Sequence, residues 1–171
     1  PICVTQNAEL IFGAYTFFGS SIKFICSNKI KIGAYTRCAY ESQFVDSNFH
    51  FVLNMKTGNV TRRESEILIG KCNWIGNRTS ITKGSKTKDF SIICAGSLMN
   101  KDYTQNEENF IMLGGSPAKV LTSGLKRIFS TEIEKDIIYF FNNNPKANNY
   151  NLTSELSDDF KDIHYWFEHM M

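Results

Sequence analysis

The chain has 171 residues, of which 42% are hydrophobic and 21% are charged, and its formal net charge is +2. This length and composition fit one globular domain with a core, and the balanced charge gives no case for nucleic-acid binding. No apolar run approaches the roughly 18 residues that span a bilayer, and the first residues do not resemble a signal peptide. Five cysteines without a CxxC pair indicate reduced thiols and a cytoplasmic protein.

The N-terminal part of the chain predicts short strands with a six-residue repeat. Residues 2–4 and 10–12 are the first two expected strands. Apolar residues then lead successive blocks of six, with a shift of two residues before the second set. These lead positions are Phe12, Phe18 and Phe24, followed by Ile32, Cys38 and Phe44. A shift of two keeps the inward face in phase, because side chains alternate along a strand, so a corner can absorb it.

The repeat stops at His50, where the next apolar lead residue should stand. The following residues, to about position 66, are polar and have no period. We therefore predict a loop that leaves the fold over about 50–66, with His50 at its root. Long loops inside compact domains are usually functional or disordered.

The clearest repeat runs from Ile69 to Lys101. Its lead positions are Ile69, Ile75, Ile81, Thr87, Ile93 and Met99, and its fifth positions are Asn73, Thr79, Ser85, Ser91 and Ser97. A period of six fits neither a helix nor simple strand alternation, but it is typical of a parallel β-helix with three flat sides. In a coil of eighteen residues Ile75 stacks on Ile93, Ile81 on Met99 and Thr79 on Ser97, about 4.8 Å apart.

Beyond the repeat, the sequence changes from strand to helix. The polar stretch YTQNEEN leaves the solenoid, and a short strand is expected over residues 110–113, before GGSPAKV. Thr131 and Glu134 have the spacing of a capping box, and a helix from there ends before Pro145. A second helix is expected over about 154–169, with an apolar stripe. The stripe consists of Leu156, Phe160, Ile163, Phe167 and Met170. We therefore divide the chain into a β-helix of residues 1–122 and a helical extension of residues 123–171.

The segment IGKCNWIGNRTSITKGSKTKDFSIICAGSLMNKD, followed by GGSPAKV, resembles the hexapeptide-repeat acyltransferases, which have a left-handed parallel β-helix. The similarity is strongest to sugar, capsule and lipopolysaccharide O-acetyltransferases. The matching positions are Ile69-Gly70, Trp74-Ile75-Gly76, Ala95-Gly96-Ser97, Lys101-Asp102 and Gly115-Ser116-Pro117-Ala118-Lys119. The left hand comes from the resemblance alone, because about 98% of parallel crossovers are right-handed.

The resemblance implies that His50 is a catalytic general base. It is the only histidine before the C-terminal tail, and the ordinary histidine pKa of about 6.5 suits proton removal at neutral pH. Asp46 and Asn48 either orient the imidazole and contact the acceptor or are ordinary turn residues. Trp74 either forms a wall of the acceptor site or packs at a coil corner.

The resemblance also implies that acetyl-coenzyme A (acetyl-CoA) is the acyl donor. Gly76, Asn77, Ala95 and Gly96 are then candidates to contact the pantetheine arm, because small residues permit close approach to the backbone. Lys101 and Lys119 either bind the phosphates or are solvated surface lysines, and Pro117 matches the family position near the adenine. No residues have the spacing of a metal site, so we expect no metal.

The implied function is transfer of an acetyl group from acetyl-CoA to a hydroxyl of a sugar or polysaccharide precursor. The resemblance further implies a homotrimer with its sites between neighbouring solenoids. Two alternatives stay open at this point. One is N-acetylation of an amino-sugar nucleotide or another amine, and the other is a non-catalytic β-solenoid scaffold.

Overall fold

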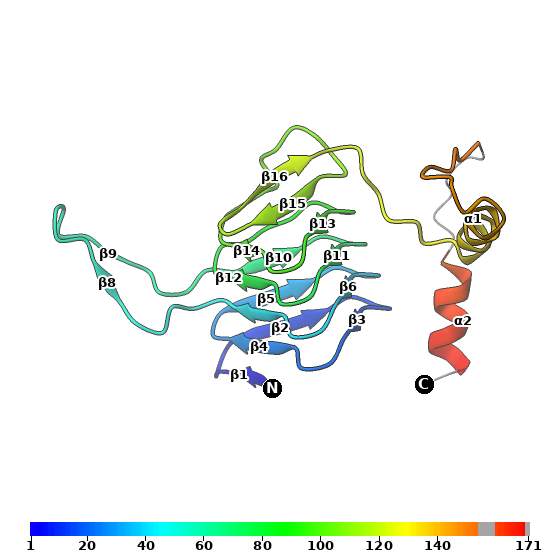
Figure 1. The fold of residues 1–171 in the computed structure, drawn as a ribbon. Helices are drawn as coiled ribbons and strands as arrows, with labels where there is room; N and C mark the ends of the chain where they lie inside the picture. Colours follow the sequence, from blue (N-terminus) through cyan, green and yellow to red (C-terminus); the bar gives the residue numbers. More distant parts are fainter. Residues whose placement is uncertain (154–159, 170–171) are drawn as a thin grey trace. The chain divides into compact units, whose positions relative to one another are not determined.

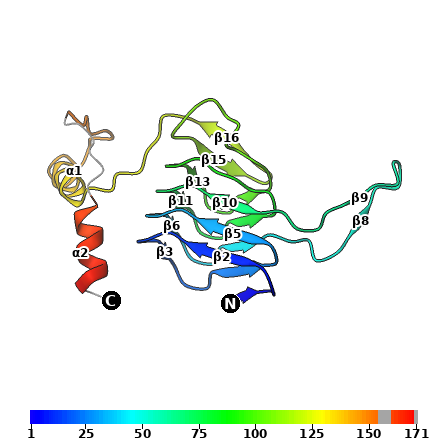
Figure 2. The same ribbon diagram turned by 180° about the vertical axis from the view of Figure 1, so that it is seen from behind.

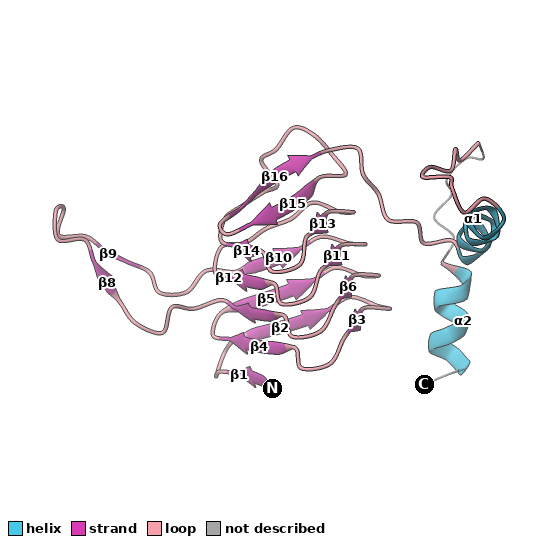
Figure 3. Ribbon diagram, in the orientation of Figure 1, coloured by secondary structure: helices cyan, strands magenta, loops and turns pink. Residues whose placement is uncertain are grey.

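The computed structural model describes residues 1–153 and 160–169. The chain divides into two compact units, Pro1–Lys126 and Arg127–Met171. The first unit consists of short strands and the second contains the helices (Figures 1 and 3).

Three sheets make up the body of the first unit. Sheet A contains β1 (Ile2–Val4), β4 (Lys23–Cys26), β7 (Gln43–Val45), β12 (Ser80–Thr82) and β14 (Leu98–Met99). Sheet B contains β2 (Glu9–Phe12), β5 (Lys29–Ile32) and β10 (Ile67–Ile69). Sheet C contains β3 (Phe17–Phe18), β6 (Arg37–Cys38), β11 (Trp74–Ile75), β13 (Ile92–Ile93), β15 (Met112–Gly115) and β16 (Ala118–Thr122).

The chain visits sheets B, C and A in turn, once per coil. Neighbouring strands within each sheet pair in parallel, apart from the antiparallel pair β15–β16 at the end of sheet C, so that the coils stack (Figure 1). Ile75 is in register with Ile93 and Ile81 with Met99, eighteen residues apart in both cases. These two stacking predictions are therefore confirmed.

The lead residues of the repeat, five of them apolar and the sixth Thr87, fill the interior of the coils. None of the six from Ile69 to Met99 exposes more than 5% of its surface. Burial of one such aliphatic side chain contributes about 1.5–3 kcal/mol. Thus a repeated anchor, rather than long strands, holds coils whose strands are often only two residues long.

The small polar residues at the fifth positions close the corners of the coils. The hydroxyls of Thr79, Ser85, Ser91 and Ser97 are buried, and each donates to the carbonyl three residues earlier. These bonds measure 2.8, 2.6, 2.9 and 2.6 Å, in that order. A buried hydroxyl without a partner would cost about 1–3 kcal/mol, so this position requires a small side chain that can bond locally.

The two-residue shift in the N-terminal repeat lengthens the first coils. Phe12 is in register with Ile32 and Phe24 with Phe44, twenty residues apart instead of eighteen. The ring centres of Phe12, Phe18 and Phe24 lie 5.0 to 5.1 Å from one another, and the cluster runs from the buried Phe24 to the exposed Phe12 at the N-terminal end of the coils.

The segment predicted as a loop leaves the coils and contains a β-hairpin, which the sequence did not indicate (Figure 1). Strand β8 (Val52–Leu53) pairs antiparallel with β9 (Val60–Thr61), and a further bridge joins Ser47 to Glu64. The coils resume where Ile69 pairs with Ile32. We call residues 47–66 the arm, and Figures 1 and 2 show that it projects well away from the coils.

The last part of sheet C also differs from the prediction. The expected strand over residues 110–113 lies at 112–115, and a second strand, β16, runs back antiparallel to it, with Leu113 opposite Val120. The side chain of Ala118 is buried against the core. GGSPAKV is therefore the tip and return strand of a hairpin.

The second unit contains α1 (Thr131–Asn143) and α2 (Lys161–His169). The N-cap of α1 is Ser130, not Thr131, because the Ser130 hydroxyl accepts the amide of Ile133 at 3.4 Å. Of the expected second helix, residues 154–159, which include Leu156, lie outside the described residues, as does Met170. Among the described residues, no helix has the length and apolarity needed to cross a bilayer.

Candidate functional site

Four of the predicted site residues line one hollow on the outer face of sheet C. Trp74, Gly76, Asn77 and Ala95 surround a space of about 330 Å³, where the chain turns from sheet C towards sheet A. The remaining wall is apolar and includes Ile92 and Met112. We call this space the sheet C hollow. Its shape and lining suit a narrow, largely apolar chain with few polar groups.

Glycine at position 76 is required by the packing of the coils. A Cβ atom added there would lie 2.4 Å from the amide nitrogen of Ala95 on the next coil. By contrast, a Cβ on Gly96 would meet nothing within 4 Å, and the backbone there has a positive φ of 69°. The neighbouring Ala95 is exposed. Bare main chain therefore lies at the surface beside the hollow and is open to close approach by a ligand.

Trp74 points outward from β11, and 46% of its surface is exposed. It lies between Arg37 on β6 and Ile92 on β13 in the sheet register. The indole thus offers a flat apolar surface at the edge of the hollow, and it also packs along the sheet. Both interpretations of the sequence are compatible with this position.

The residues proposed for the nucleotide end of the donor do not line the hollow. Strand β15 follows β13 in sheet C, so the β15–β16 hairpin lies next to the hollow along the same sheet. Pro117 and Lys119 are exposed at the turn and on the return strand of this hairpin. Lys101 is exposed after β14, with its ammonium nitrogen 5.4 Å from the centre of the Tyr103 ring.

His50 is exposed on the arm. Near it, the amide of Asn48 donates to the carbonyl of Arg63 at 2.9 Å and closes the root of the arm. Phe49 has a positive φ of 60°, and its amide donates to the hydroxyl of Ser47 at 3.0 Å. The tight turn at Phe49 therefore fixes the main chain directly before His50.

Among the described residues, the hydrogen-bond partners of the Asp46 carboxylate lie on the preceding coil, so Asp46 does not orient His50. Its carboxylate is fully buried and accepts the amides of Ser27 at 2.7 Å and Asn28 at 2.8 Å. Burial raises the pKa of the Cys26 thiol to about 11, and the negative charge of the neighbouring Asp46 carboxylate is the second cause of this rise. The main-chain carbonyl of Asp46 accepts the amide of Ser65 at 3.0 Å. Asp46 thus ties both ends of the arm to the preceding coil.

A single chain does not bring His50 and the sheet C hollow together. The arm connects β7 of sheet A to β10 of sheet B, and in a three-sided coil the corner between these sheets lies opposite sheet C. Figures 1 and 2 agree that the arm extends away from β11 and β13. Among the described residues, no group of three or more His, Cys, Asp or Glu side chains is placed to hold a metal ion.

No family model and no curated protein matches the chain. Among solved structures, it is similar to the polysialic acid-specific acetyltransferase NeuO, with 20% identity and a TM-score of 0.64 over 95% of this chain and 64% of that one. It is also similar to the polysialic acid O-acetyltransferase OatWY, with 21% identity and a TM-score of 0.56 over 77% of this chain and 64% of that one. A third structure is a mutant of the N-acyltransferase AntD from Bacillus cereus in complex with dTDP and coenzyme A, with 11% identity and a TM-score of 0.57 over 77% of this chain and 71% of that one.

These likenesses establish a shared fold. The chain has the repeat-coil architecture of acyltransferases whose solved structures include polysialic acid acetyltransferases. It spans 64% of the length of NeuO and of OatWY.

Proposed function

We propose that this chain is an acetyl-CoA-dependent acetyltransferase with a left-handed parallel β-helix, and that it acetylates a hydroxyl of a sugar or polysaccharide precursor. The observation that carries the proposal is the gathering of Trp74, Gly76, Asn77 and Ala95 around one hollow on sheet C. The fold shared with acyltransferases, one of them in complex with coenzyme A, supports it.

In this proposal, the donor lies along sheet C. The pantetheine arm occupies the sheet C hollow and runs over the exposed main chain at Ala95 and Gly96, where no side chain blocks it. The nucleotide end extends towards Pro117 and Lys119 on the adjoining hairpin. Lysine ammonium groups at that end serve as point charges for phosphates.

The proposed reaction is a direct transfer. The His50 imidazole takes the proton of the acceptor hydroxyl, and the hydroxyl oxygen attacks the thioester carbonyl carbon. The carbon–sulfur bond then breaks, and coenzyme A leaves as the thiol with a proton supplied by the imidazolium. Main-chain amides of the coil stabilise the negative oxygen that forms during attack, which is usually a large contribution to such reactions.

We further propose that the site forms between copies of the chain in a homotrimer. His50 and the sheet C hollow lie on opposite sides of one chain, so the arm of one copy must reach the hollow of another. The arm also exposes several apolar side chains, among them Phe51 at 66% and Met55 at 85%. A neighbouring copy would cover these side chains, and a closed ring gives each copy one arm and one hollow to share.

The likeness to AntD favours a second candidate, transfer to an amine. A panel of sugars that carry either free hydroxyls or free amino groups separates the two, with release of free thiol from acetyl-CoA as the measurement. We expect release with the hydroxyl acceptors. Release with amino sugars alone would replace the first candidate by the second.

A binding measurement tests the remaining alternative, a non-catalytic scaffold. Acetyl-CoA at about a hundredfold excess over its Kd stabilises a protein that binds it by about 2.7 kcal/mol. We expect a corresponding rise in the melting temperature. If acetyl-CoA produces no shift, the chain does not bind the donor and the proposed function fails.

A further inference from the structure

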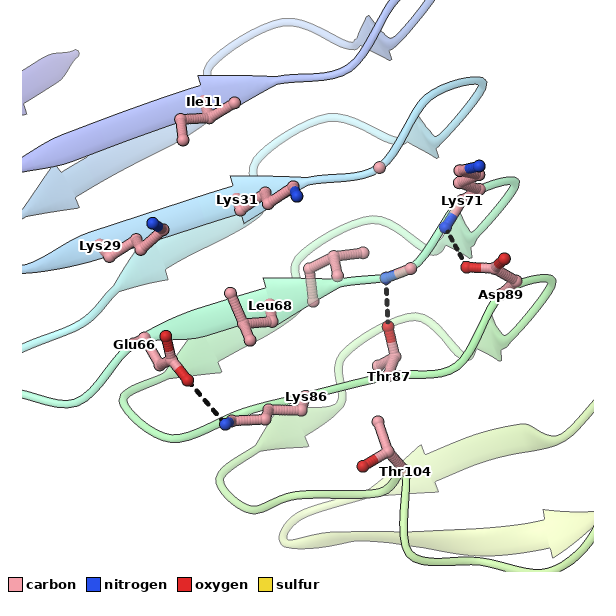
Figure 4. Close-up of a pocket in the computed structure, with 13 residues that line it drawn as sticks. Ile11, Lys29, Lys31, Glu66, Leu68, Lys71, Lys86, Thr87, Asp89 and Thr104 are labelled. Carbon is pink, nitrogen blue, oxygen red and sulfur yellow. Dashed lines mark hydrogen bonds and ion pairs between the residues drawn. The ribbon is translucent and has the colours of Figure 1, made fainter.

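A second hollow, larger than the one on sheet C, lies on the outer face of sheet B. It has a volume of about 650 Å³, and four lysines line it: Lys29, Lys31, Lys71 and Lys86 (Figure 4). We call it the basic hollow. The transfer reaction proposed above uses none of these lysines.

Two glycines, Gly33 and Gly70, line the basic hollow. A Cβ atom added to Gly33 would lie 2.5 Å from the backbone of the next coil at Gly70, and one added to Gly70 would lie 2.5 Å from the backbone at Lys88. Close stacking of the coils therefore requires glycine at both positions. The two glycines lie between Lys31 and Leu68 on one side and Lys71 and Asp89 on the other (Figure 4).

The positive charge without an acidic partner in the basic hollow is concentrated at two lysines. Two acids line the hollow against four lysines, and two further acids flank it, since Glu9 pairs with the Lys29 ammonium at 2.6 Å and Asp102 is in register with Lys86. Both acids that line the hollow have partners, since Glu66 bonds the Lys86 ammonium at 2.7 Å and Asp89 accepts the Lys71 amide at 2.7 Å. Within the described residues, no acidic side chain pairs with the ammonium groups of Lys31 and Lys71.

Cationic and apolar side chains alternate across the basic hollow. The sheet register places Ile11, Lys31, Leu68 and Lys86 in one outward row across successive coils. The main-chain positions of adjacent members lie about 4.8 Å apart, so those of Lys31 and Lys86 are about 10 Å apart. A chain of rings with repeated negative charges matches both the spacing and the apolar patches between the cations.

The basic hollow is continuous with the arm. Glu66, the last residue of the arm, lines it, and the arm carries His50. A polymer that lies in the hollow therefore leads towards the proposed general base.

We propose that the basic hollow binds an acidic glycan, a polysaccharide with carboxylate groups, as the part of the acceptor that extends beyond the reacting hydroxyl. This inference rests on the proposed function for its place in the reaction, but glycan binding itself needs no acetyl transfer. The carboxylates pair with Lys31 and Lys71, and the sugar rings lie on Ile11 and Leu68.

The test compares the double variant Lys31→Glu/Lys71→Glu with the control Lys23→Glu. Lys23 is an exposed strand lysine on β4 of sheet A, so the control changes the charge outside the basic hollow. The probe is fluorescently labelled polysialic acid, with neutral dextran and a single-stranded RNA as comparison polymers, and binding is followed by anisotropy at low and high salt without acetyl-CoA. We expect the double variant to bind polysialic acid at least about tenfold more weakly, the control to bind as the wild type does, and salt to weaken binding.

Three outcomes overturn the inference. They are unchanged binding of polysialic acid by the double variant, equal binding of dextran, and tighter binding of the RNA. A changed mass of the double variant in sedimentation would also overturn it, since the face would then be a contact between copies. The binding measurement uses no acetyl-CoA, so it can fail or succeed independently of the transfer reaction. A protein that binds the glycan but releases no thiol from acetyl-CoA would contradict the proposed function and leave this inference intact.

Discussion

At the scale of single residues, the first prediction concerns His50. It is exposed on the arm and is the only histidine of the first unit. Replacing it with Ala removes the proposed proton acceptor, so we expect kcat for thiol release to fall about 10²–10⁴-fold. The thermal shift with acetyl-CoA should stay unchanged, because the proposed donor site lies on sheet C. A variant with wild-type kcat would remove His50 from the mechanism.

The structure assigns Asp46 a different role from the one that its position in the sequence indicated. Its carboxylate holds the amides of Ser27 and Asn28, nineteen and eighteen residues away. Asp46→Ala leaves two amides without their acceptor, so we expect the free energy of unfolding to fall by about 1–3 kcal/mol. Asp46→Asn keeps one acceptor oxygen and should lose less. Denaturant unfolding measures both, and an Ala variant with wild-type stability would contradict this anchoring role.

The buried thiols give a prediction about pH. Burial raises the pKa of Cys26 to about 11 and that of Cys38 to about 12, from an ordinary value of 9.0. Because the folded-state pKa is the higher one, the stabilisation is complete below the unfolded value and is lost as pH rises through the folded value. We therefore expect the free energy of unfolding to decline above pH 9.

Alkylation with iodoacetamide checks the same thiols. At neutral pH the exposed Cys3 should react in the folded protein, whereas Cys26 and Cys38 should react only after unfolding. Mass spectrometry of the labelled peptides distinguishes them. Rapid labelling of Cys26 in the native protein would show that its thiol is more accessible than the structure indicates.

At the scale of elements, the arm is separable from the coils. The bridge between Ser47 and Glu64 closes its root, and the core residues of β7 and β10 lie outside it. Replacing residues 48–63 with a short glycine turn should therefore leave the unfolding transition of the coils in place. Since the replacement removes His50 and the exposed apolar residues of the arm, we expect loss of acetyl transfer and of oligomer formation.

Thiol release and sedimentation velocity measure these two losses. Arm-deleted protein that still transfers acetyl groups would show that the general base lies elsewhere. An arm-deleted protein that keeps the wild-type oligomer mass would mean that the arm is not the contact between copies.

At the scale of the whole molecule, the separation of His50 from the sheet C hollow predicts complementation between copies. His50→Ala removes the proposed general base on the arm, and Ala95→Trp fills the sheet C hollow. Each variant alone should therefore be inactive. When both are co-expressed, arms and hollows combine at random in a closed ring, and about a quarter of the sites should be intact. Thiol release by the mixture measures this recovery. An inactive mixture that still forms mixed oligomers would place the complete site within one chain.

The periodic part of the fold was predictable from the sequence because each inward position recurs at a fixed interval. The anchors from Ile69 to Met99, the polar corners and the stacking of Ile75 on Ile93 all follow from that interval. The gathering of Gly76, Asn77 and Ala95 follows in the same way, since residues eighteen apart lie on adjacent coils. In a repeat, the local sequence pattern therefore predicts contacts between residues that are far apart along the chain.

Features outside the repeat were decided by tertiary structure alone. The arm is a hairpin because its two halves pair with each other, and Asp46 is buried because the preceding coil presents two amides to it. The basic hollow brings together lysines from separate coils and glycines that the stacking of the coils requires. These contacts depend on which coil lies against which segment. No fixed interval in the sequence specifies that arrangement, so only the tertiary structure could show these contacts.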